Sequence, residues 1–338
     1  MQRRRDLLEP RHHLHAGGGE HRQQIGAFGL EYVEIGVQVA RAAVVMAGVH
    51  GHRRAGFRLR ARAGAQHQFG QATAAEQARS GGSGVYYHIQ WLNGATTAYT
   101  WLNTTPPALI WEEMSKAWQY GAKNLWVLNV GDIKPGEIGT EFFLDLAWDP
   151  QRYRHDNVRD FLVRWATRDL DPRFADEIAG IMEQYYRLGF TRRPEHLVQF
   201  RAKSPLQYSW FSHTESNDEA SQRVEQYDAI ARRAQTVYDQ LPPARKDAFF
   251  QLVLYPVQCA SLINRKVIFA DKSTRHGIEG RACASEDAAK AKDAAARIIE
   301  LTAHYNTGLV TVSNKWNHMM SPAPGPWGTQ FRQFDMPP

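Results

Sequence analysis

A strand, a helix and a second strand follow one another between residues 84 and 130, and this order limits the fold more than any other feature of the sequence. In the first segment, VYYHIQW (residues 85–91), alternate side chains point to opposite faces, one apolar and one polar. The last segment, LWVLNV (residues 125–130), is nearly continuous apolar sequence, as in a parallel strand that is covered on both sides. The three segments therefore predict a βαβ unit with a right-handed connection.

The helix of this unit has a recognisable start and one apolar stripe. Thr105 is its candidate N-terminal cap, and Pro106 stands in its first turn. Apolar residues then recur with helical spacing at Ile110, Met114, Ala117, Trp118 and Gly121. After the second strand, GDIKPGEIG predicts a loop and TEFFLDLAWDP (residues 140–150) predicts a short helix that ends near Pro150.

The two faces of the first strand suit the wall of a barrel, with helices against one face and the interior near the other. The apolar face consists of Val85, Tyr87, Ile89 and Trp91, and the polar face of Tyr86, His88 and Gln90. From about residue 155 the apolar pattern is helical almost throughout. One stripe of this region consists of Phe174, Ile178, Ile181, Met182, Tyr185 and Leu188, and another of Tyr227, Ile230, Ala234, Val237 and Leu241.

The expected fold class is therefore α/β followed by all-α, predominantly helical overall. Residues 81–154 are expected to be βα units, with a first strand that suits a barrel wall. Residues 155–320 are expected to be a helical domain of five to seven helices, and residues 321–338 a Pro-rich tail.

Residues 1–80 differ sharply in composition from the rest of the chain. They hold 12 Arg, no Lys and 6 acidic residues, and they account for the whole net charge of +6, because the other residues hold 29 basic and 29 acidic side chains. Arg, Ala and Gly dominate, and these are the residues that GC-rich codons specify in any reading frame. We therefore expect residues 1–80 to be a disordered or mistranslated stretch, with a genuine basic tail as the alternative. An apolar run at residues 29–49 could still form a strand or a helix.

Several classes of protein are disfavoured by the sequence. A nucleic-acid partner is not expected, because the chain after residue 80 is neutral. No apolar stretch approaches the eighteen residues of a membrane span, and the N-terminus lacks the apolar run of a secretion signal. Cys259 and Cys283 form no CxxC pair, so no metal site is expected. Phosphate-binding, zinc-protease, serine-hydrolase and dinucleotide motifs are absent too, and no cofactor is expected.

Polar side chains end both predicted strands. In parallel βα folds, functional groups collect at the carboxyl ends of the strands. His88 could bind or protonate a ligand, and Asn129 could hold a hydroxyl group; the alternatives are a structural histidine and a side chain that fixes the loop backbone. Trp91 could stack on a sugar ring, or it could belong to the core. Asp132 is more typical of a turn or a cap than of a catalytic acid.

Two further groups of residues carry less specific signals. Glu137, Glu141 and Asp145 stand four residues apart and would share one helical face, for which a solvated acidic face is the favoured interpretation. The segment KWNHMM (residues 315–320) combines polar and aromatic side chains near a helix end, but its spacing assigns it no chemistry.

Three long segments together resemble glycoside hydrolase family 115. They are GVYYHIQW (residues 84–91), the segment from WLNTTPP to LAWDP (residues 101–150) and NKWNHMMSPAPGPWGTQ (residues 314–330). The resemblance runs from about residue 83 to 333 and does not include residues 1–80. It implies a xylan α-1,2-glucuronidase, which removes (4-O-methyl-)glucuronic acid from glucuronoxylan. It also assigns residues 81–154 to the C-terminal βα units of a (β/α)8 barrel and the following residues to a helical domain. Because residues 83–170 can supply only two or three of the eight units that a closed barrel needs, an incomplete (β/α)8 barrel segment is expected.

The resemblance also implies roles for particular residues. His88, Asn129 and Trp91 would contact the uronic acid, with Trp91 the weaker match because the family usually has Tyr there. The principal catalytic carboxylates would stand upstream of residue 81, so the catalytic residues are unknown and we expect a chain that lacks them. The alternative is a non-catalytic carbohydrate-binding or helical interaction module. A homodimer, and a secreted or periplasmic location for the full-length family, are implied only by the resemblance.

Overall fold

The computed structural model describes residues 58–62, 78, 80–90, 101–197, 209, 211–311 and 314–321. The chain divides into two units, Met1–Arg54 and Ala55–Pro338, and all the described residues belong to the second. Trp91, residues 322–338 and most of residues 1–80 lie outside the described residues.

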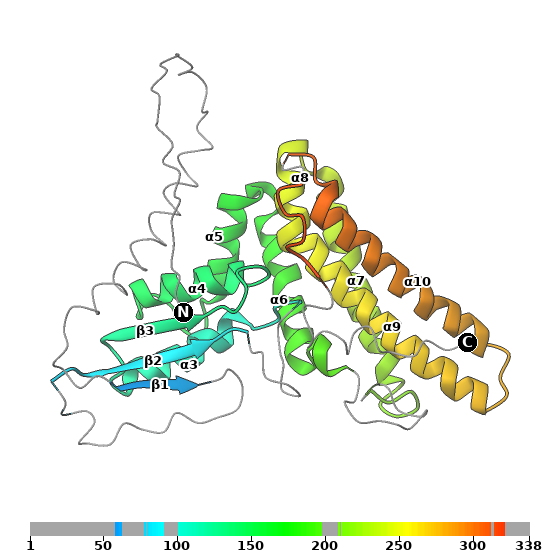
Figure 1. The fold of residues 1–338 in the computed structure, drawn as a ribbon, viewed down its shortest axis with the longest axis horizontal. Coiled ribbons are helices and arrows are strands. Elements are labelled where there is room, and N and C mark those ends of the chain that lie inside the picture. The colour runs from blue at the N-terminus through cyan, green and yellow to red at the C-terminus, as the bar shows by residue number, and fades with distance from the viewer. Residues whose placement is uncertain are drawn as a thin grey trace, which may run out of the picture. The chain divides into compact units, whose positions relative to one another are not determined.

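The described residues form a small parallel sheet and a larger set of helices (Figure 1). In chain order the elements are β1 (Arg58–Arg62), β2 (Ser83–His88), α3 (Pro107–Gln119), β3 (Leu125–Asn129), α4 (Glu137–Trp148), α5 (Arg159–Asp169), η3 (Pro172–Phe174), α6 (Ala175–Thr191), η4 (Pro194–His196), α7 (Glu219–Gln240), α8 (Pro243–Phe249), η5 (Phe250–Leu254), α9 (Tyr255–Ile278), α10 (Ala284–Ala303) and η6 (His304–Gly308).

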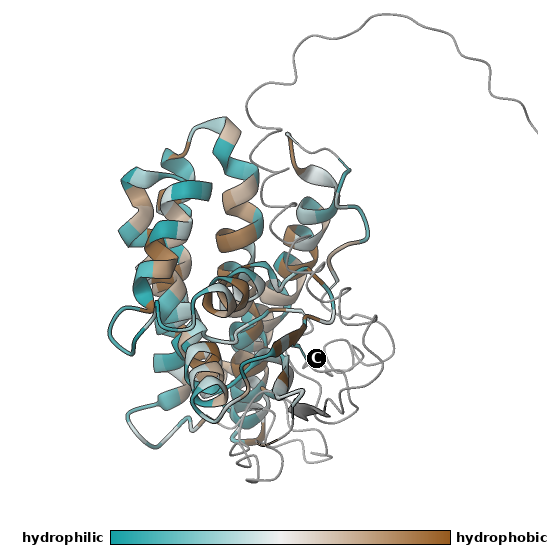
Figure 2. Cartoon of the chain, turned by 90° about the vertical axis from the view of Figure 1, so that its left-hand side faces the viewer, coloured by the Kyte–Doolittle hydropathy of each residue, from teal (hydrophilic) through white to brown (hydrophobic). Residues whose placement is uncertain are grey.

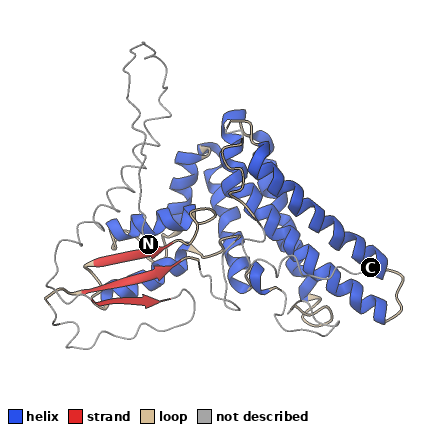
Figure 3. Ribbon diagram, in the orientation of Figure 1, coloured by secondary structure: helices blue, strands red, loops and turns tan. Residues whose placement is uncertain are grey.

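The sheet has the strand order β1-β2-β3, and both pairs are parallel (Figure 3). The predicted βαβ unit is confirmed as β2, α3 and β3. Strand β1 lies within residues 1–80, where composition had suggested no ordered structure. Composition did not predict this strand, because strands pair through main-chain N–H and C=O groups, which every residue type except proline carries. Three parallel strands are compatible with a barrel segment but do not test closure into eight strands, so the incomplete barrel stays a prediction.

Strand β2 presents its apolar face to the helices, as predicted. Val85, Tyr87 and Ile89 are at most 2 % exposed, and the Tyr87 ring is stacked on Phe143 of α4, with 6.1 Å between ring centroids. Gln90 departs from the prediction, because it is 3 % exposed although it was assigned to the polar face. Its side-chain oxygen Oε1 accepts a hydrogen bond from the backbone N–H of Asp132 at 2.5 Å, so the side chain is buried against the loop after β3.

Helix α3 keeps its predicted stripe but not its predicted cap. Ile110, Met114 and Ala117 are buried. The N-cap position is Pro106, and no side chain caps the helix. Thr105 stands one residue too early for this role, and its hydroxyl donates to the carbonyl oxygen of Ile89 at 3.4 Å. The cap expectation for Thr105 is therefore wrong, and its side chain ties the start of α3 to the end of β2.

The helical part confirms the predicted apolar stripes. Those of α6 and α7 are buried, apart from the half-buried Phe174, and α7 ends just before Pro242. Among the described residues after 155 there are six α-helices, within the predicted range. Helices α8 and α9 are continuous through the π-helical turn η5. Pro256 explains this interruption, because it lacks the N–H that would bond to the carbonyl four residues earlier.

The core is continuous from the sheet to the last helices. One cluster of buried residues extends from Val85 on β2, through α4 and α6, to Tyr305 and Met320. The helices carry alternating apolar and hydrophilic stripes, as expected for elements that bury one face (Figure 2). In the part of the chain that the structure describes, no helix is long and apolar enough to cross a membrane.

Two glycines of α6 provide a matched test of this packing. A Cβ atom at Gly189 would lie 2.4 Å from Cβ of the buried Thr104, whereas at Gly180 it would meet only the flexible end of Arg233 at 3.3 Å. We expect Gly189→Ala to lower the free energy of unfolding by about 1–3 kcal/mol through overpacking. Gly180→Ala should raise it by up to about 1 kcal/mol through helix propensity. Chemical denaturation of the full chain measures both, and equal effects would contradict the packing described here.

Candidate functional site

The structure brings His88 and Asn129 together at the carboxyl ends of adjacent strands. They are register partners, the last residues of β2 and β3. The Tyr86 ring lies beside His88, with 4.8 Å between ring centroids, and the Asn129 amide donates to the Tyr86 hydroxyl at 2.7 Å. All three side chains are half-buried. They form a polar strand-end cluster, defined here as Tyr86, His88 and Asn129.

Asn129 also fixes the loop that follows β3. Its side-chain oxygen accepts a hydrogen bond from the backbone N–H of Gly131 at 2.9 Å. Gly131 has a positive φ of 62°, and a Cβ atom there would lie 2.0 Å from the Gln90 side chain, so a larger residue would be strained and would displace Gln90. The alternative that Asn129 holds the loop backbone is therefore observed. An amide has a second hydrogen and a second lone pair, so Asn129 can still bind a ligand.

His88 is neutral near pH 7. Burial lowers the pKa of its imidazole, and a backbone hydrogen bond with Gln90 offsets part of this effect. A neutral imidazole has one donor and one acceptor nitrogen, and the hydrogen bond with Gln90 engages one of them. The other nitrogen suits a ligand hydroxyl group, and a carboxylate when the ring is protonated. The cluster can therefore donate and accept hydrogen bonds without carrying a permanent charge.

Trp91 and Asp132 were also considered as site residues, and the structure describes only Asp132. Trp91 lies outside the described residues, so its contact with a ligand stays a prediction. Asp132 has an exposed position in the loop after β3, where its backbone N–H is held by Gln90. This position agrees with the interpretation of Asp132 as a turn residue.

Lys134 is the residue near the strand ends that sequence reasoning missed. Its side chain is 8 % exposed, and its ammonium donates to Glu137 at 2.7 Å and to Gln251 of η5 at 3.1 Å. The same nitrogen lies 4.3 Å from the centroid of the Trp316 ring. Only the Glu137 contact has a local signal, a spacing of three residues. Gln251 is 117 positions away, so no local pattern could indicate it.

The three carboxylates of α4 are partly exposed, and each is paired with a basic side chain, which the expectation of a solvated acidic face did not include. Basic residues from the preceding loop and from the region of α5 neutralise them, and their side chains are only 25–36 % exposed. Burial raises the pKa of Glu141 even beside its arginine partner. The pairs are Glu137 with Lys134 (2.7 Å), Glu141 with Arg168 (2.8 Å) and Asp145 with Arg152 (2.7 Å) and Arg164 (3.2 Å).

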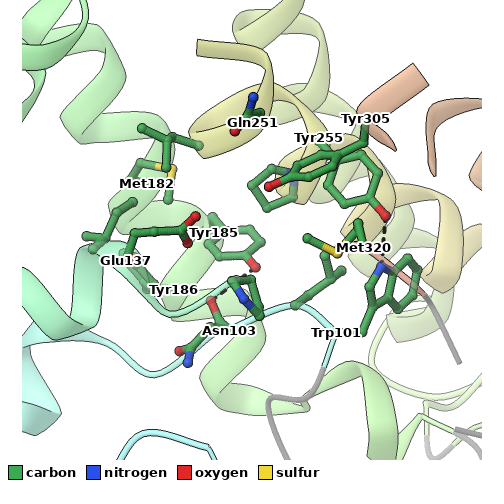
Figure 4. A pocket seen from close by; sticks show the side chains of 15 residues that line it. Trp101, Asn103, Glu137, Met182, Tyr185, Tyr186, Gln251, Tyr255, Tyr305 and Met320 are labelled. Carbon is green, nitrogen blue, oxygen red and sulfur yellow. Dashed lines mark hydrogen bonds between the residues drawn. The ribbon is translucent and has the colours of Figure 1, made fainter. Parts of the chain in front are cut away.

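A small cavity is lined by Glu137 and Gln251, the two hydrogen-bond partners of Lys134, and lies between α4, α6, η5 and η6 (Figure 4). Its volume is about 30 Å³, and its lining also includes Tyr186 and Tyr305. Burial, with a smaller contribution from Glu137, raises the pKa of both phenols, so both stay protonated and can donate. This volume suits one or two water molecules and is too small for a monosaccharide.

Comparisons with known proteins agree on one family. The family model described as glycosyl hydrolase family 115 matches residues 63–196. A solved structure, described as a novel family GH115 4-O-methyl-alpha-glucuronidase with specificity for decorated arabinogalactans, is 33 % identical with a TM-score of 0.65. That match covers 76 % of this chain and 33 % of the other, so this chain spans about a third of its relative. No curated protein matches the chain.

The family match begins earlier than the motifs indicated. It starts at residue 63, inside the stretch 1–80 that showed no resemblance by inspection. Strand β1 directly precedes this point and pairs with β2. The βα segment that carries the strand-end cluster therefore begins before residue 81.

Lys134 and Lys123 provide a matched test of the junction between the loop after β3 and the helical part, which is defined here as the contacts of Lys134 with Glu137, Gln251 and Trp316. Each ammonium lies over a Trp ring, but Lys123 is exposed, whereas Lys134 is buried with a carboxylate. We expect Lys134→Met to lower the free energy of unfolding by about 1–3 kcal/mol, because it leaves Glu137 without its partner. Lys123→Met should change it by less than about 0.5 kcal/mol.

The double variant Lys134→Met with Glu137→Leu separates the charge pair from general packing. It should recover part of the loss, because the unpaired carboxylate is then removed as well. Denaturant unfolding of the wild-type chain, Lys134→Met, Glu137→Leu and the double variant measures this coupling. If the double variant loses the sum of the two single effects, the pair does not stabilise this junction.

Proposed function

We propose that this chain is part of a glycosidase that removes uronic acid side groups from a decorated polysaccharide, because residues 63–196 match the model of glycoside hydrolase family 115. In this proposal, the described residues form a wall of the sugar-binding site at the carboxyl ends of β2 and β3. In this proposal His88 and Asn129 contact the uronic acid, and Trp91 provides an aromatic surface for its ring.

The in-register position of His88 and Asn129 is the observation that carries this proposal. Parallel strands end at one edge, so their terminal side chains converge where βα enzymes bind their substrates. Both side chains are half-buried and uncharged at neutral pH, with unused hydrogen-bonding capacity on Asn129. Such a cluster suits the hydroxyl and carboxylate groups of a uronic acid.

The proposed leaving group is (4-O-methyl-)glucuronic acid, and glucuronoxylan is the proposed polymer. The solved relative is described as a 4-O-methyl-alpha-glucuronidase with specificity for decorated arabinogalactans. Decorated arabinogalactan is therefore a second candidate polymer. Because the strand-end cluster would contact the side group and not the main chain of the polymer, it does not distinguish the two. Side-by-side assays on both polysaccharides decide between them.

We propose that the 338-residue chain lacks the principal catalytic carboxylates, as the family resemblance implies. Inverting hydrolysis needs two carboxyl groups roughly 6.5–9.5 Å apart. Near β3, Glu137 is paired with Lys134 beside a cavity that is too small for a sugar, and Asp132 lies in an exposed turn. Neither side chain is placed as a member of such a pair.

A homodimer is a further proposal from the resemblance, which sedimentation of the purified chain would test.

The central test combines binding and hydrolysis with the 338-residue chain. We expect saturable binding of 4-O-methylglucuronic acid-bearing oligosaccharides without release of the uronic acid. His88→Ala and Asn129→Ala should each weaken binding by at least about 10-fold, as expected for a lost hydrogen bond to a charged or polar ligand. His155→Ala is the control, because His155 is exposed and lies outside the cluster.

Each other outcome of this test has a distinct meaning. Robust release of uronic acid would contradict the proposed lack of the catalytic carboxylates and would direct attention to Asp132 and Glu137. Binding that is insensitive to both cluster substitutions would instead favour a non-catalytic carbohydrate-binding or helical interaction module. Absence of binding to either polysaccharide would contradict the proposed site.

The lowered pKa of His88 predicts a pH dependence of uronate binding. The free imidazole is neutral at pH 7, and a bound carboxylate beside it would favour the protonated form. Binding should therefore take up a proton and strengthen as the pH falls from about 7 to about 5, until the uronate itself is protonated near pH 4. Calorimetry in buffers of different ionisation heat measures the proton uptake. His88→Gln should abolish it, and an unchanged profile would exclude a His88–uronate contact.

A further inference from the structure

Three side chains with different donor atoms converge at the turn between α9 and α10. His276 stands in the last turn of α9, Cys283 directly precedes α10, and Asp287 lies in the first turn of α10. Nδ1 of His276 lies 2.8 Å from Oδ2 of Asp287 and 3.3 Å from Sγ of Cys283. The three donor atoms all lie within 4.8 Å of one another. In Figure 1 this turn is remote from the carboxyl ends of β2 and β3.

The geometry distinguishes a metal site from a catalytic triad. In a nucleophile–base–carboxylate triad, the nucleophile and the carboxylate bind different nitrogens of the histidine. Here the thiol and the carboxylate approach the same nitrogen, Nδ1. A single nitrogen cannot hold its proton for the carboxylate and accept the thiol proton at once. Convergence of sulfur, nitrogen and oxygen on one point is what a metal ion requires.

We propose that His276, Cys283 and Asp287 bind a divalent metal ion of borderline softness, with Zn²⁺ as the first candidate. Thiolate and imidazole ligands favour zinc, whereas Mg²⁺ and Ca²⁺ prefer oxygen ligands alone. With Zn–N near 2.0 Å and Zn–S near 2.3 Å, tetrahedral ligand atoms stand about 3.3–3.7 Å apart. The thiol–imidazole distance of 3.3 Å lies in this range, and the imidazole–carboxylate distance of 2.8 Å would have to lengthen by about 0.5 Å. The thiol and the carboxylate lie within 4.8 Å of each other, so the binding of an ion would draw these two side chains closer together.

The surroundings leave the site supported and accessible. Cys283 and Asp287 are four residues apart and share one face at the start of α10. The Asp287 side chain is 8 % exposed, and its other oxygen lies 3.8 Å from Lys290, which itself pairs with Glu286 at 2.8 Å. Cys283 and His276 are half-buried, so a fourth position can be filled from solvent. A bound ion would join the end of α9 to the start of α10.

This site is independent of the proposed sugar site and was not indicated by the sequence. The cysteines form no CxxC pair, and one of the two, Cys259, is fully buried in the core. The ligands come from a helix end, a turn and the next helix, which only the tertiary structure places together. The positive φ of 68° at Gly280 belongs to the turn that allows this approach.

Titration of the full chain with Co²⁺ tests the site directly, because a thiolate ligand gives cobalt a sulfur-to-metal charge-transfer band. We expect a band that saturates near one equivalent, is displaced by Zn²⁺ and disappears in Cys283→Ser. His276→Asn and Asp287→Asn should each weaken binding by at least about 10-fold. Cys259→Ala and Glu286→Gln are matched controls that should retain the band. Histidines of residues 1–80 could bind cobalt, but they cannot produce the sulfur band.

Alkylation provides a second readout that does not depend on cobalt. Zn²⁺ should slow the labelling of Cys283 at least about 10-fold, since the bound thiolate is shielded, and this protection should be lost in His276→Asn. A wild-type chain with no charge-transfer band, a band that persists in Cys283→Ser, or labelling of Cys283 that Zn²⁺ does not change would each overturn the proposal.

Discussion

The register between β2 and β3 is the constraint on which the candidate site depends. Val85, Tyr87 and Ile89 are buried against the helices, so the opposite face of β2 must carry Tyr86 and His88. A slip of one residue would turn His88 into the core and expose the apolar set. Burial of three apolar side chains therefore fixes which polar groups meet Asn129. The position of the site follows from the packing behind the sheet.

The loop after β3 links this edge of the sheet to the helical part. Asn129 and Gln90 hold its first residues through backbone N–H groups, and Lys134 holds its end through Glu137, Gln251 and the Trp316 ring. The π-helical turn that contains Gln251 arises where Pro256 interrupts the ladder of α9. Segments far along the chain thus help to hold the loop at the carboxyl ends of the strands. The helices after residue 155 pack against one another, and their buried residues also share one core with the βα segment.

The family match and the local geometry support different parts of the proposed function. Residues 63–196 match the family model, and the chain spans a third of the solved relative. In the proposal, the described residues contribute hydrogen-bonding groups that would contact the substrate, whereas the α4 carboxylates are paired with basic side chains. The site at the α9–α10 turn rests on its own contacts and is unaffected by the choice of polysaccharide.

The sequence by itself determined the βαβ unit, the helical character after residue 155, the buried stripes and the polar strand ends, because these features have periods of two or 3.6 residues. The long motifs also indicated the family. Only the tertiary structure decided the pairing of β1, the burial of Gln90, the role of Thr105 and the neutralisation of the α4 carboxylates. It also decided the contacts of Lys134 and the convergence of His276, Cys283 and Asp287. Each depends on where main-chain groups and side chains from different elements meet in space, and a local pattern carries no record of those partners.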